Sequence, residues 1–483
     1  MCYNVLMNKL SVLLVVILLF VAGCARYIDK TAADISHNIP EYIKNSDILE
    51  QIDGDDVFAD NDPIQNMFYM FDDQNLRLIM TTALKNNPDV LSVASRIRQA
   101  RSEALIAGAE LFPTVSIGAD YSYTGNNSSS TGSTSKSNLN LSATFSWELD
   151  IFGRIDSEKK AASERVYAAE NELVAARVSL LSDAAVYYFS IRSSAIRLNV
   201  YKKITENYNE LLKVYRQQLE FGFVEASEVM KAENDFLNAY NSMKNLEVEL
   251  EKNKNALLVL TGGNDIGFDV FSEYTMPVPR LPHIESISAE AILNRPDVKV
   301  SINNYTAELY RTLGSRGALY PSVRISGSLG QIVASSTGVG DLVWQIAGSI
   351  SAPLLNRKEL YESLNIQEES EKQARYTLTK TINTALSEIE DSVFQAGASE
   401  NILANSRYVY NNTSETMTFI EGKYEYGLAD IVEMLKSRNE VLNTKLSLYT
   451  SEYNNIVSSI NLYKALGGAF GKPIKTVENG IDY

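Results

Sequence analysis

The chain has 483 residues, of which 45% are hydrophobic and 22% are charged, a composition that is typical of folded proteins and excludes wholesale disorder. The formal net charge of −16 argues against a nucleic-acid partner, because surfaces that bind nucleic acids are basic. Much of this acidity lies in residues 25–73, which contain twelve Asp or Glu and three Lys or Arg residues. Such a run is typical of a solvated surface.

Residues 1–23 have the pattern of a secretory signal peptide. Their apolar stretch, residues 10–21, follows a lysine and is too short to span a bilayer comfortably as a permanent helix. The sequence VAGC that ends at Cys24 resembles the lipobox of bacterial lipoproteins, in which the cysteine is lipidated and becomes the new N-terminus. Ala25, where an Asp would favour the inner membrane, points to the outer membrane. A plain signal peptide that happens to contain a cysteine remains the alternative. The other cysteine of the sequence would leave with the signal, so no internal disulfide is expected.

Two halves of the chain repeat each other. The sequence NNPDV at 86–90 returns as NRPDV at 294–298, and FGFVEASEVMKAENDFLN from Phe221 returns as YGLADIVEMLKSRNEVLN from Tyr426. The two pairs of motifs are offset by 208 and 205 residues. A repeat near 200 residues indicates duplication of a whole structural half, because solenoid repeats have only about 20–50 residues. We divide the chain into a signal peptide (1–23), an N-terminal segment (24–73), a first repeat (74–281), a second repeat (282–468) and a C-terminal tail without readable structure (469–483).

Each half is expected to contain a helix, two strands, a long helix, a turn and a shorter return helix. The long helix of the first half, 155–220, contains no Pro and no interior Gly, and its length is on the order of 100 Å. The opening and return helices are each about half as long, so the two stacked end to end would match the long one. Such lengths suggest a coiled-coil cylinder or stalk. The other helices are expected at about 75–110, 225–260, 288–316, 358–425 and 430–466.

Four stretches alternate between polar and apolar residues, a pattern that predicts strands. The polar residues 124–138 are expected to form a flexible loop between the first two strands. Both tryptophans of the chain, Trp147 and Trp344, lie on the apolar faces. The strands are expected at approximately 113–124, 138–152, 320–331 and 341–354.

These strands fit either a soluble antiparallel sheet or a membrane-spanning one, because both alternate. Three features favour the membrane: the stretches reach the ~9–11 residues that a tilted transmembrane strand needs, aromatic residues lie at strand ends, and the chain is exported. Four strands cannot close a barrel, and open edges are forbidden in lipid. Subunits must therefore pool strands, so that two copies would give eight and three would give twelve.

The second strand runs directly into the first long helix through the sequence FGR at 152–154. A membrane strand followed by a helix of about 100 Å is expected to be a pore continued by a tunnel. We place the junction at Asp150, Gly153 and Arg154, with the glycine permitting the tight change of backbone geometry.

The motifs SWELDIFGRI, LFPTVSI with LYPSVRI, LEFGFVEASEVMKAE, YEYGLADIVEMLKSR and LYKALGGAF, together with the lipobox, resemble those of the outer-membrane efflux proteins, the TolC-like export ducts, and most closely their OprM-type lipoprotein branch. The resemblance covers essentially the whole chain after the signal. It implies a homotrimer in the outer membrane of a Gram-negative bacterium, with a twelve-stranded transmembrane β-barrel continuous with an α-helical barrel of coiled-coil-like hairpins. Its implied partners are outer-membrane lipid, a periplasmic adaptor (membrane fusion) protein and an inner-membrane transporter, which supplies the energy. The acidic N-terminal segment would wrap the equatorial region of the helical barrel.

The same resemblance places the two helix–helix turns, 220–229 and 424–434, at the far periplasmic tip. There Tyr424 takes the position of a gating tyrosine and Glu433 that of an acidic ring residue. Ala429 replaces a gating Arg and Lys436 replaces a second acid of some ducts, which leaves open whether a salt-bridged lock exists; ordinary solvated charges are the alternative. Gly222 and Gly427 are expected at positive φ, as a helix hairpin requires. The tip and gate candidates are Tyr424, Gly427, Asp430, Glu433, Lys436, Gly222, Glu225 and Glu228.

No enzymatic signature accompanies these features. His37 and His283 are the only histidines and lie outside the repeated elements. The sequence has no zinc-ligand spacing, phosphate-binding Gly loop or nucleophile elbow, so neither a metal nor another cofactor is expected. A static lipid-anchored tether or stalk is the main alternative, although it leaves the four strands unexplained. A simple diffusion porin does not fit the helix content.

Overall fold

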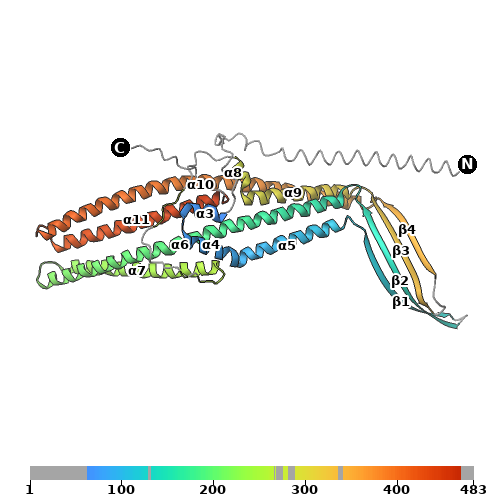
Figure 1. Cartoon of the computed structure of the whole chain (residues 1–483), viewed down its shortest axis with the longest axis horizontal. Coiled ribbons are helices and arrows are strands. Elements are labelled where there is room, and N and C mark those ends of the chain that lie inside the picture. Colours follow the sequence, from blue (N-terminus) through green and yellow to red (C-terminus); the bar gives the residue numbers. More distant parts are fainter. Residues whose placement is uncertain are drawn as a thin grey trace. The chain divides into compact units, whose positions relative to one another are not determined.

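The computed structural model describes residues 63–128, 132–265, 267, 276–280, 289–335 and 341–468 (Figure 1). The expected lipidation site Cys24, both histidines and the tail at 469–483 lie outside the described residues. The chain divides into two compact units. Among the described residues, unit 1 comprises 95–171 and 299–380, which include the whole sheet, and unit 2 comprises the other helical residues.

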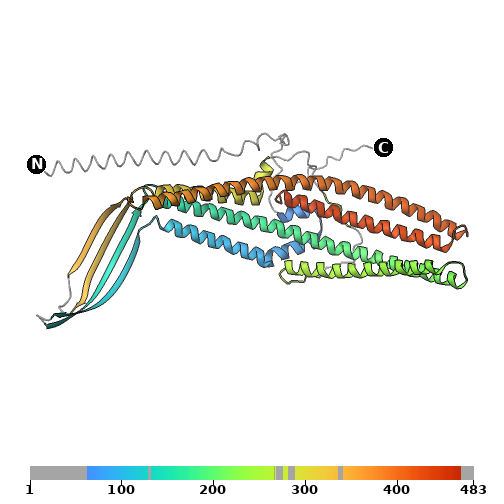
Figure 2. The same cartoon turned by 180° about the vertical axis from the view of Figure 1, so that it is seen from behind.

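Helices account for most of the described chain, and Figure 2 shows them from behind. The two long helices, α6 and α10, begin and end within one residue of their predicted bounds. By length and composition alone, an 18-residue window of α6 is apolar enough to cross a membrane, with a mean hydropathy of 1.2, and 56% of this window is buried inside the protein. The helices are α3 (Pro63–Phe71), α4 (Gln74–Asn86), α5 (Pro88–Ala109), α6 (Arg154–Glu220), α7 (Ala226–Leu260), α8 (Ala289–Asn294), α9 (Pro296–Gly317), α10 (Arg357–Glu425) and α11 (Ile431–Ala465).

The single helix expected at 75–110 is wrong, because the chain breaks at Asn87 into α4 and α5. Pro88 lacks an N–H and forces the preceding residue out of helical geometry, and Asn87 accordingly has φ −67° and ψ 123°. The Asn87 side chain then begins α5, since its Oδ1 accepts hydrogen bonds from the backbone N–H groups of Asp89 and Val90 at 3.0 and 3.2 Å. The helix expected at 288–316 breaks for the same reason before Pro296, into α8 and α9.

The sheet lies in unit 1 and contains four antiparallel strands in the order β1-β2-β3-β4 (Figure 1). The prediction of a flexible loop at 124–138 is wrong, because the pairing of β1 with β2 continues as far as Ser128 opposite Gly132. Ser, Thr and Asn residues sustain this pairing because the ladder hydrogen bonds come from the backbone rather than from side chains. The strands are β1 (Thr114–Ser128), β2 (Gly132–Leu149), β3 (Ser322–Ser335) and β4 (Leu342–Ser351).

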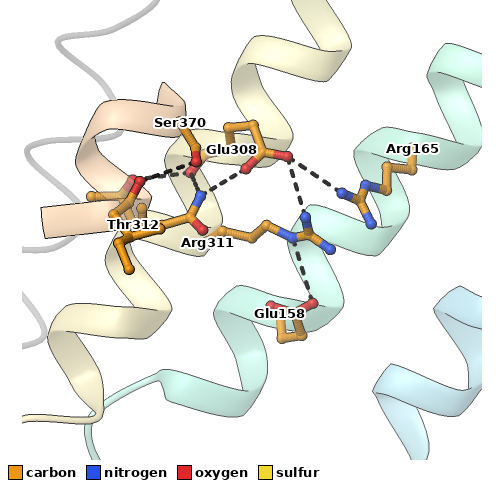
Figure 3. Close-up of polar contacts among 8 residues, drawn as sticks. Glu158, Arg165, Glu308, Arg311, Thr312 and Ser370 are labelled. Carbon is orange, nitrogen blue, oxygen red and sulfur yellow. Dashed lines mark hydrogen bonds and ion pairs between the residues drawn. The ribbon is translucent and has the colours of Figure 1, made fainter. Parts of the chain in front are cut away.

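Glu308 of α9 connects three helices of unit 1 (Figure 3). Its Oε1 accepts hydrogen bonds from Arg165 of α6 and Arg311 of α9, both at 3.3 Å, and its Oε2 accepts one from Gln367 of α10 at 2.7 Å. The Nε of Arg311 also lies 3.7 Å from Glu158 of α6. A single partly buried carboxylate thus fixes the relative positions of α6, α9 and α10.

The main hydrophobic core lies in unit 2, where α3 and α4 contribute apolar side chains that pack with those of α6 and α11. Asp73 ties the N-terminal part of this core to α6. Its Oδ1 accepts hydrogen bonds from the first backbone N–H groups of α4, and its Oδ2 accepts one from the Tyr188 hydroxyl and one from Arg192, both at 2.8 Å. Burial raises the pKa of Tyr188, so this hydroxyl stays protonated as a donor.

Candidate functional site

The sheet has one polar and one apolar face, and both faces run across all four strands. One row of paired residues consists of Ser116, Thr144, Ser328 and Gln345. The adjacent row consists of Ile117, Ala143, Leu329 and Trp344. Because successive residues of a strand point to opposite faces, these rows lie on opposite sides of the sheet.

The apolar face is uncovered in the single chain. Ile117 is 86% exposed and Trp344 is 71% exposed, although both are large and apolar. A soluble sheet would bury such a face against a second layer. An uncovered apolar face opposite a polar one is the arrangement of a membrane-spanning barrel wall.

The described part of the sheet also has two open edges, since β1 pairs only with β2 and β4 pairs only with β3. Unpaired backbone groups are too costly in lipid to remain open. The sheet therefore requires strands from other copies of the chain to complete it.

At the junction between β2 and α6, the three residues singled out from the sequence lie together. Gly153 has φ +70°, a value that favours glycine. The Asp150 carboxylate accepts hydrogen bonds from the backbone N–H groups of Ile155 at 3.0 Å and Asp156 at 2.7 Å, and so satisfies the first turn of α6. Its negative charge also lies at the positive end of the helix dipole. The sharp change from strand to helix is thereby stabilised by one glycine and one carboxylate.

Arg154 takes part in a charge cluster that sequence reasoning missed. Its Nη2 lies 2.9 Å from Oε1 of Glu148, and Nη2 of Arg324 lies 3.1 Å from Oε2 of the same carboxylate. Glu148 and Arg324 are 176 positions apart and are brought together by the pairing of β2 with β3. The sequence showed only that Glu148 and Arg324 are charged residues of the polar face, each at the end of its strand nearest to a helix.

The two hairpin turns of unit 2 have the same backbone geometry. After α6, the N–H of Phe223 bonds to Gln218 O at 2.8 Å and the N–H of Gly222 bonds to Leu219 O at 2.9 Å. After α10, the equivalent bonds join Leu428 to Lys423 and Gly427 to Tyr424, at 2.8 and 3.0 Å. This double pattern is a Schellman motif, and the predicted positive φ of its glycines is confirmed at +74° for Gly222 and +70° for Gly427.

The two return helices begin differently. The Asp430 carboxylate caps α11 by accepting a hydrogen bond from the N–H of Glu433 at 2.7 Å. Glu225, at the equivalent position before α7, makes no side-chain cap and instead accepts a hydrogen bond from Ser227 at 3.2 Å. Glu228 and Glu433 lie in the first turns of α7 and α11, where the helix dipole favours acidic residues.

Lys436 turns toward α6. Its ammonium lies 5.8 Å from the centroid of the Tyr215 ring. A hydrogen bond to Tyr215 raises the pKa of Lys436, and the nearby carboxylates of Glu228 and Asp430 raise it further. Lys436 thus links the second hairpin to the first within one chain. Tyr424, the gating candidate, is 39% exposed.

The sequence matches the family model of the outer membrane efflux proteins at residues 79–263 and 287–468, in both halves of the chain. It is 26% identical over 411 residues to the solvent efflux pump outer membrane protein SrpC of Pseudomonas putida, covering 83% of this chain and 86% of SrpC. It is 24% identical over 420 residues to the cation efflux system protein CusC of Escherichia coli K12, covering 85% of this chain and 90% of CusC. Among solved structures, the CmeC outer membrane channel of Campylobacter jejuni shares the fold with a TM-score of 0.75 at 22% identity, over 87% of this chain and 90% of CmeC.

Proposed function

This chain belongs to the outer membrane efflux protein family, and we propose that three copies of it form a passive duct through which cargo leaves the cell. The observation that supports this proposal most strongly is the four-stranded sheet with one uncovered apolar face and two open edges. Three such sheets joined edge to edge form a twelve-stranded barrel with the apolar face toward lipid and the polar face toward the lumen. A covalent lipid on Cys24 would add an anchor in the same membrane.

The helical part supplies the periplasmic tunnel of this duct. α6 spans 67 residues from the strand junction to the first turn, a length on the order of 100 Å. α10 does the same with 69 residues in the second half. The turns are proposed to contact a periplasmic adaptor, which connects the duct to an inner-membrane transporter.

The second turn is proposed to hold the gate. Tyr424 and Glu433 would face their counterparts around the threefold axis, and the contact of Lys436 with Tyr215 would hold the two hairpins of one chain together. Opening requires this contact to loosen. The gate would therefore be a packing and cation–π contact within each chain rather than a salt-bridged lock.

Cargo selection is proposed to reside largely in the transporter. SrpC is named for a solvent pump and CusC for a cation system, yet this chain is about equally similar to both. Selection by the transporter would allow related ducts to serve different cargo. The duct itself performs no chemical step in this scheme and needs no cofactor.

The proposal is tested in a strain that lacks the protein. Accumulation of an exported dye should rise in that strain and return to normal with the intact chain. A variant with both Tyr215→Cys and Lys436→Cys should export the dye when untreated and fail when a bifunctional thiol reagent cross-links the two cysteines. Each single-cysteine variant is the matched control and should export under both conditions.

A static tether predicts a different result. Loss of a tether would weaken the envelope without raising accumulation of the dye, and this outcome would overturn the duct. A cross-link between the hairpins that leaves export unchanged would overturn the proposed gate alone.

A further inference from the structure

The charge cluster of Glu148, Arg154 and Arg324 lies where β2 meets α6, and it contains two positive groups and one negative group. Glu148 contacts two guanidinium groups, at 2.9 Å from Arg154 and 3.1 Å from Arg324. The side chain of Glu148 is 21% exposed, whereas those of Arg154 and Arg324 are 40% and 55% exposed. The carboxylate is therefore the inner member of the cluster, and the guanidinium groups are what a solute meets.

Neighbouring charges leave this imbalance in place. The Asp150 carboxylate is bound by two backbone N–H groups of α6, and Asp156 is paired with Lys160 at 3.0 Å. At the equivalent junction of the second half, Arg357 begins α10, and β4, the strand before it, contains no acidic residue. Lys358 and Glu359 follow Arg357 and offset each other in charge.

The polar face is uncharged for a long distance beyond the cluster. The next charged residue on this face is Asp120, which pairs with Asn140. Asn140 lies eight residues along β2 from Glu148, or roughly 27 Å at the rise of an antiparallel strand. The intervening positions of the polar face carry Ser, Thr, Gly, Gln, Ala and Val residues. The field of the cluster is therefore not cancelled by acids on the same wall.

We infer that Glu148, Arg154 and Arg324 form an electropositive collar where the barrel meets the helical tunnel, and that this collar favours anionic cargo. The inference rests on the proposed duct, because the trimer brings three copies around one lumen. These three residues give each copy two guanidinium groups and one carboxylate, so the collar of a trimer has three net positive charges. The further carboxylate of each copy, Asp150, is bound by backbone N–H groups at the positive end of the α6 dipole. Rings of Arg in a pore select for anions, and a low-dielectric wall strengthens their field. The collar is a selectivity element of the channel itself, independent of the transporter.

The test places a reporter thiol beside the collar. Ser326 lies two residues from Arg324 on the same face, about 7 Å away, and Ser142 lies six residues from Glu148, about 20 Å away. In native trimers, Ser326→Cys and Ser142→Cys are each treated with an anionic sulfonatoethyl and a cationic trimethylammonium methanethiosulfonate. The unsubstituted protein provides the background, and a free small thiol provides the intrinsic ratio of rates.

The collar predicts that Ser326→Cys reacts faster with the anionic reagent, with a normalised rate ratio of roughly five- to tenfold for one net charge at about 7 Å in water. Adding Arg324→Gln should abolish this preference, Arg324→Lys should keep it, and Glu148→Gln should increase it. Molar salt should remove it, because the Debye length falls to about 3 Å. The ratio at Ser142→Cys should stay near one in every background, since about 20 Å is two Debye lengths at 0.1 M salt.

Two failures are distinguishable. If the thiol at Ser326 reacts readily but equally with both reagents, the collar is wrong and the duct stands. If the thiols at both positions stay unreactive in the native trimer and react only after unfolding, the polar face does not line a lumen. That result would overturn the proposed barrel together with the collar.

Discussion

Asn87 and Arg295 occupy equivalent positions in the two halves of the chain, and each donates a hydrogen bond to the final carbonyl of a return helix. Nδ2 of Asn87 bonds to the carbonyl oxygen of Leu260 at 3.1 Å, and Nη1 of Arg295 bonds to that of Ala465 at 2.6 Å. The end of α7 is thereby fixed to the start of α5, and the end of α11 to the start of α9. Both contacts lie within unit 2, and each joins the end of one helix to the start of another.

The first prediction concerns this pair. Asn87→Ala removes both the hydrogen bond to Leu260 and the cap of α5, and should lower the free energy of unfolding by about 1–2 kcal/mol. Arg295→Ala should cost more, about 2–3 kcal/mol, because the buried Arg295 also donates charge-assisted hydrogen bonds to Asp297 at 2.8 Å and Glu388 at 2.6 Å. Urea unfolding of the detergent-solubilised protein measures both. Equal losses in the two variants would contradict the larger role of Arg295.

The second prediction compares two adjacent glycines at the end of α7. Gly262 and Gly263 have φ +67° and +82°, so alanine is strained at both. A Cβ at Gly263 would meet open space, whereas one at Gly262 would collide with the backbone carbonyl of Asn86. Gly263→Ala should therefore cost about 1–2 kcal/mol from backbone strain alone, and Gly262→Ala should cost clearly more. The same urea titration decides this, and an equal cost would mean that the contact between Asn86, at the end of α4, and the end of α7 yields easily.

The third prediction concerns Glu308, which connects α6, α9 and α10 (Figure 3). Glu308→Ala should lower the free energy of unfolding by about 1–3 kcal/mol, because Arg165, Arg311 and Gln367 lose their shared acceptor. Glu369→Ala is the matched control. Glu369 pairs only with Lys372 within its own helix among the described ion pairs, at the surface, and its loss should cost about 0.5 kcal/mol or less. Thermal melts followed by circular dichroism compare the two; a control as damaging as Glu308→Ala would contradict the bridging role.

The fourth prediction is a dependence on pH. Burial raises the pKa of Glu452 above its ordinary value of 4.5, and Arg407, at 3.9 Å, only partly opposes this. The folded state therefore binds this proton more tightly than the unfolded state, so the group's contribution to stability is full below pH 4.5 and is lost as the pH rises through the folded-state pKa. Glu452→Gln, which stays neutral, should raise the melting temperature at pH 7 and have no effect near pH 4. A gain that persists unchanged at pH 4 would show that the charge of Glu452 is not its cause.

The long helices were predictable because local sequence decides them. Residues 155–220 contain no Pro and no interior Gly, and α6 follows this prediction to within one residue. The turn glycines Gly222 and Gly427 were predictable for a similar reason, since a helix hairpin needs a residue that adopts positive φ. The break at Asn87 was equally visible in the sequence, because a proline follows it, and the prediction of one continuous helix overlooked the constraint that proline places on its predecessor.

The charge cluster was beyond sequence reasoning. The cluster forms because the register between β2 and β3 places Glu148 opposite Arg324. A shift of one residue would have placed Arg324 on the opposite face. The orientation of Lys436 was also unpredictable, because its partner Tyr215 lies on another helix and meets it only after the hairpins pack. Long-range pairing of this kind follows from tertiary structure rather than from local pattern.

The most direct test of the whole account is the native mass of the protein extracted in mild detergent from separated outer membranes. The account predicts a particle of three chains in the outer-membrane fraction, because two open sheet edges and four strands per chain require three copies for a twelve-stranded barrel. A monomer, or a species that leaves the membrane without detergent, would contradict the pooled barrel. The strands would then belong to a soluble sheet on a lipid-tethered stalk.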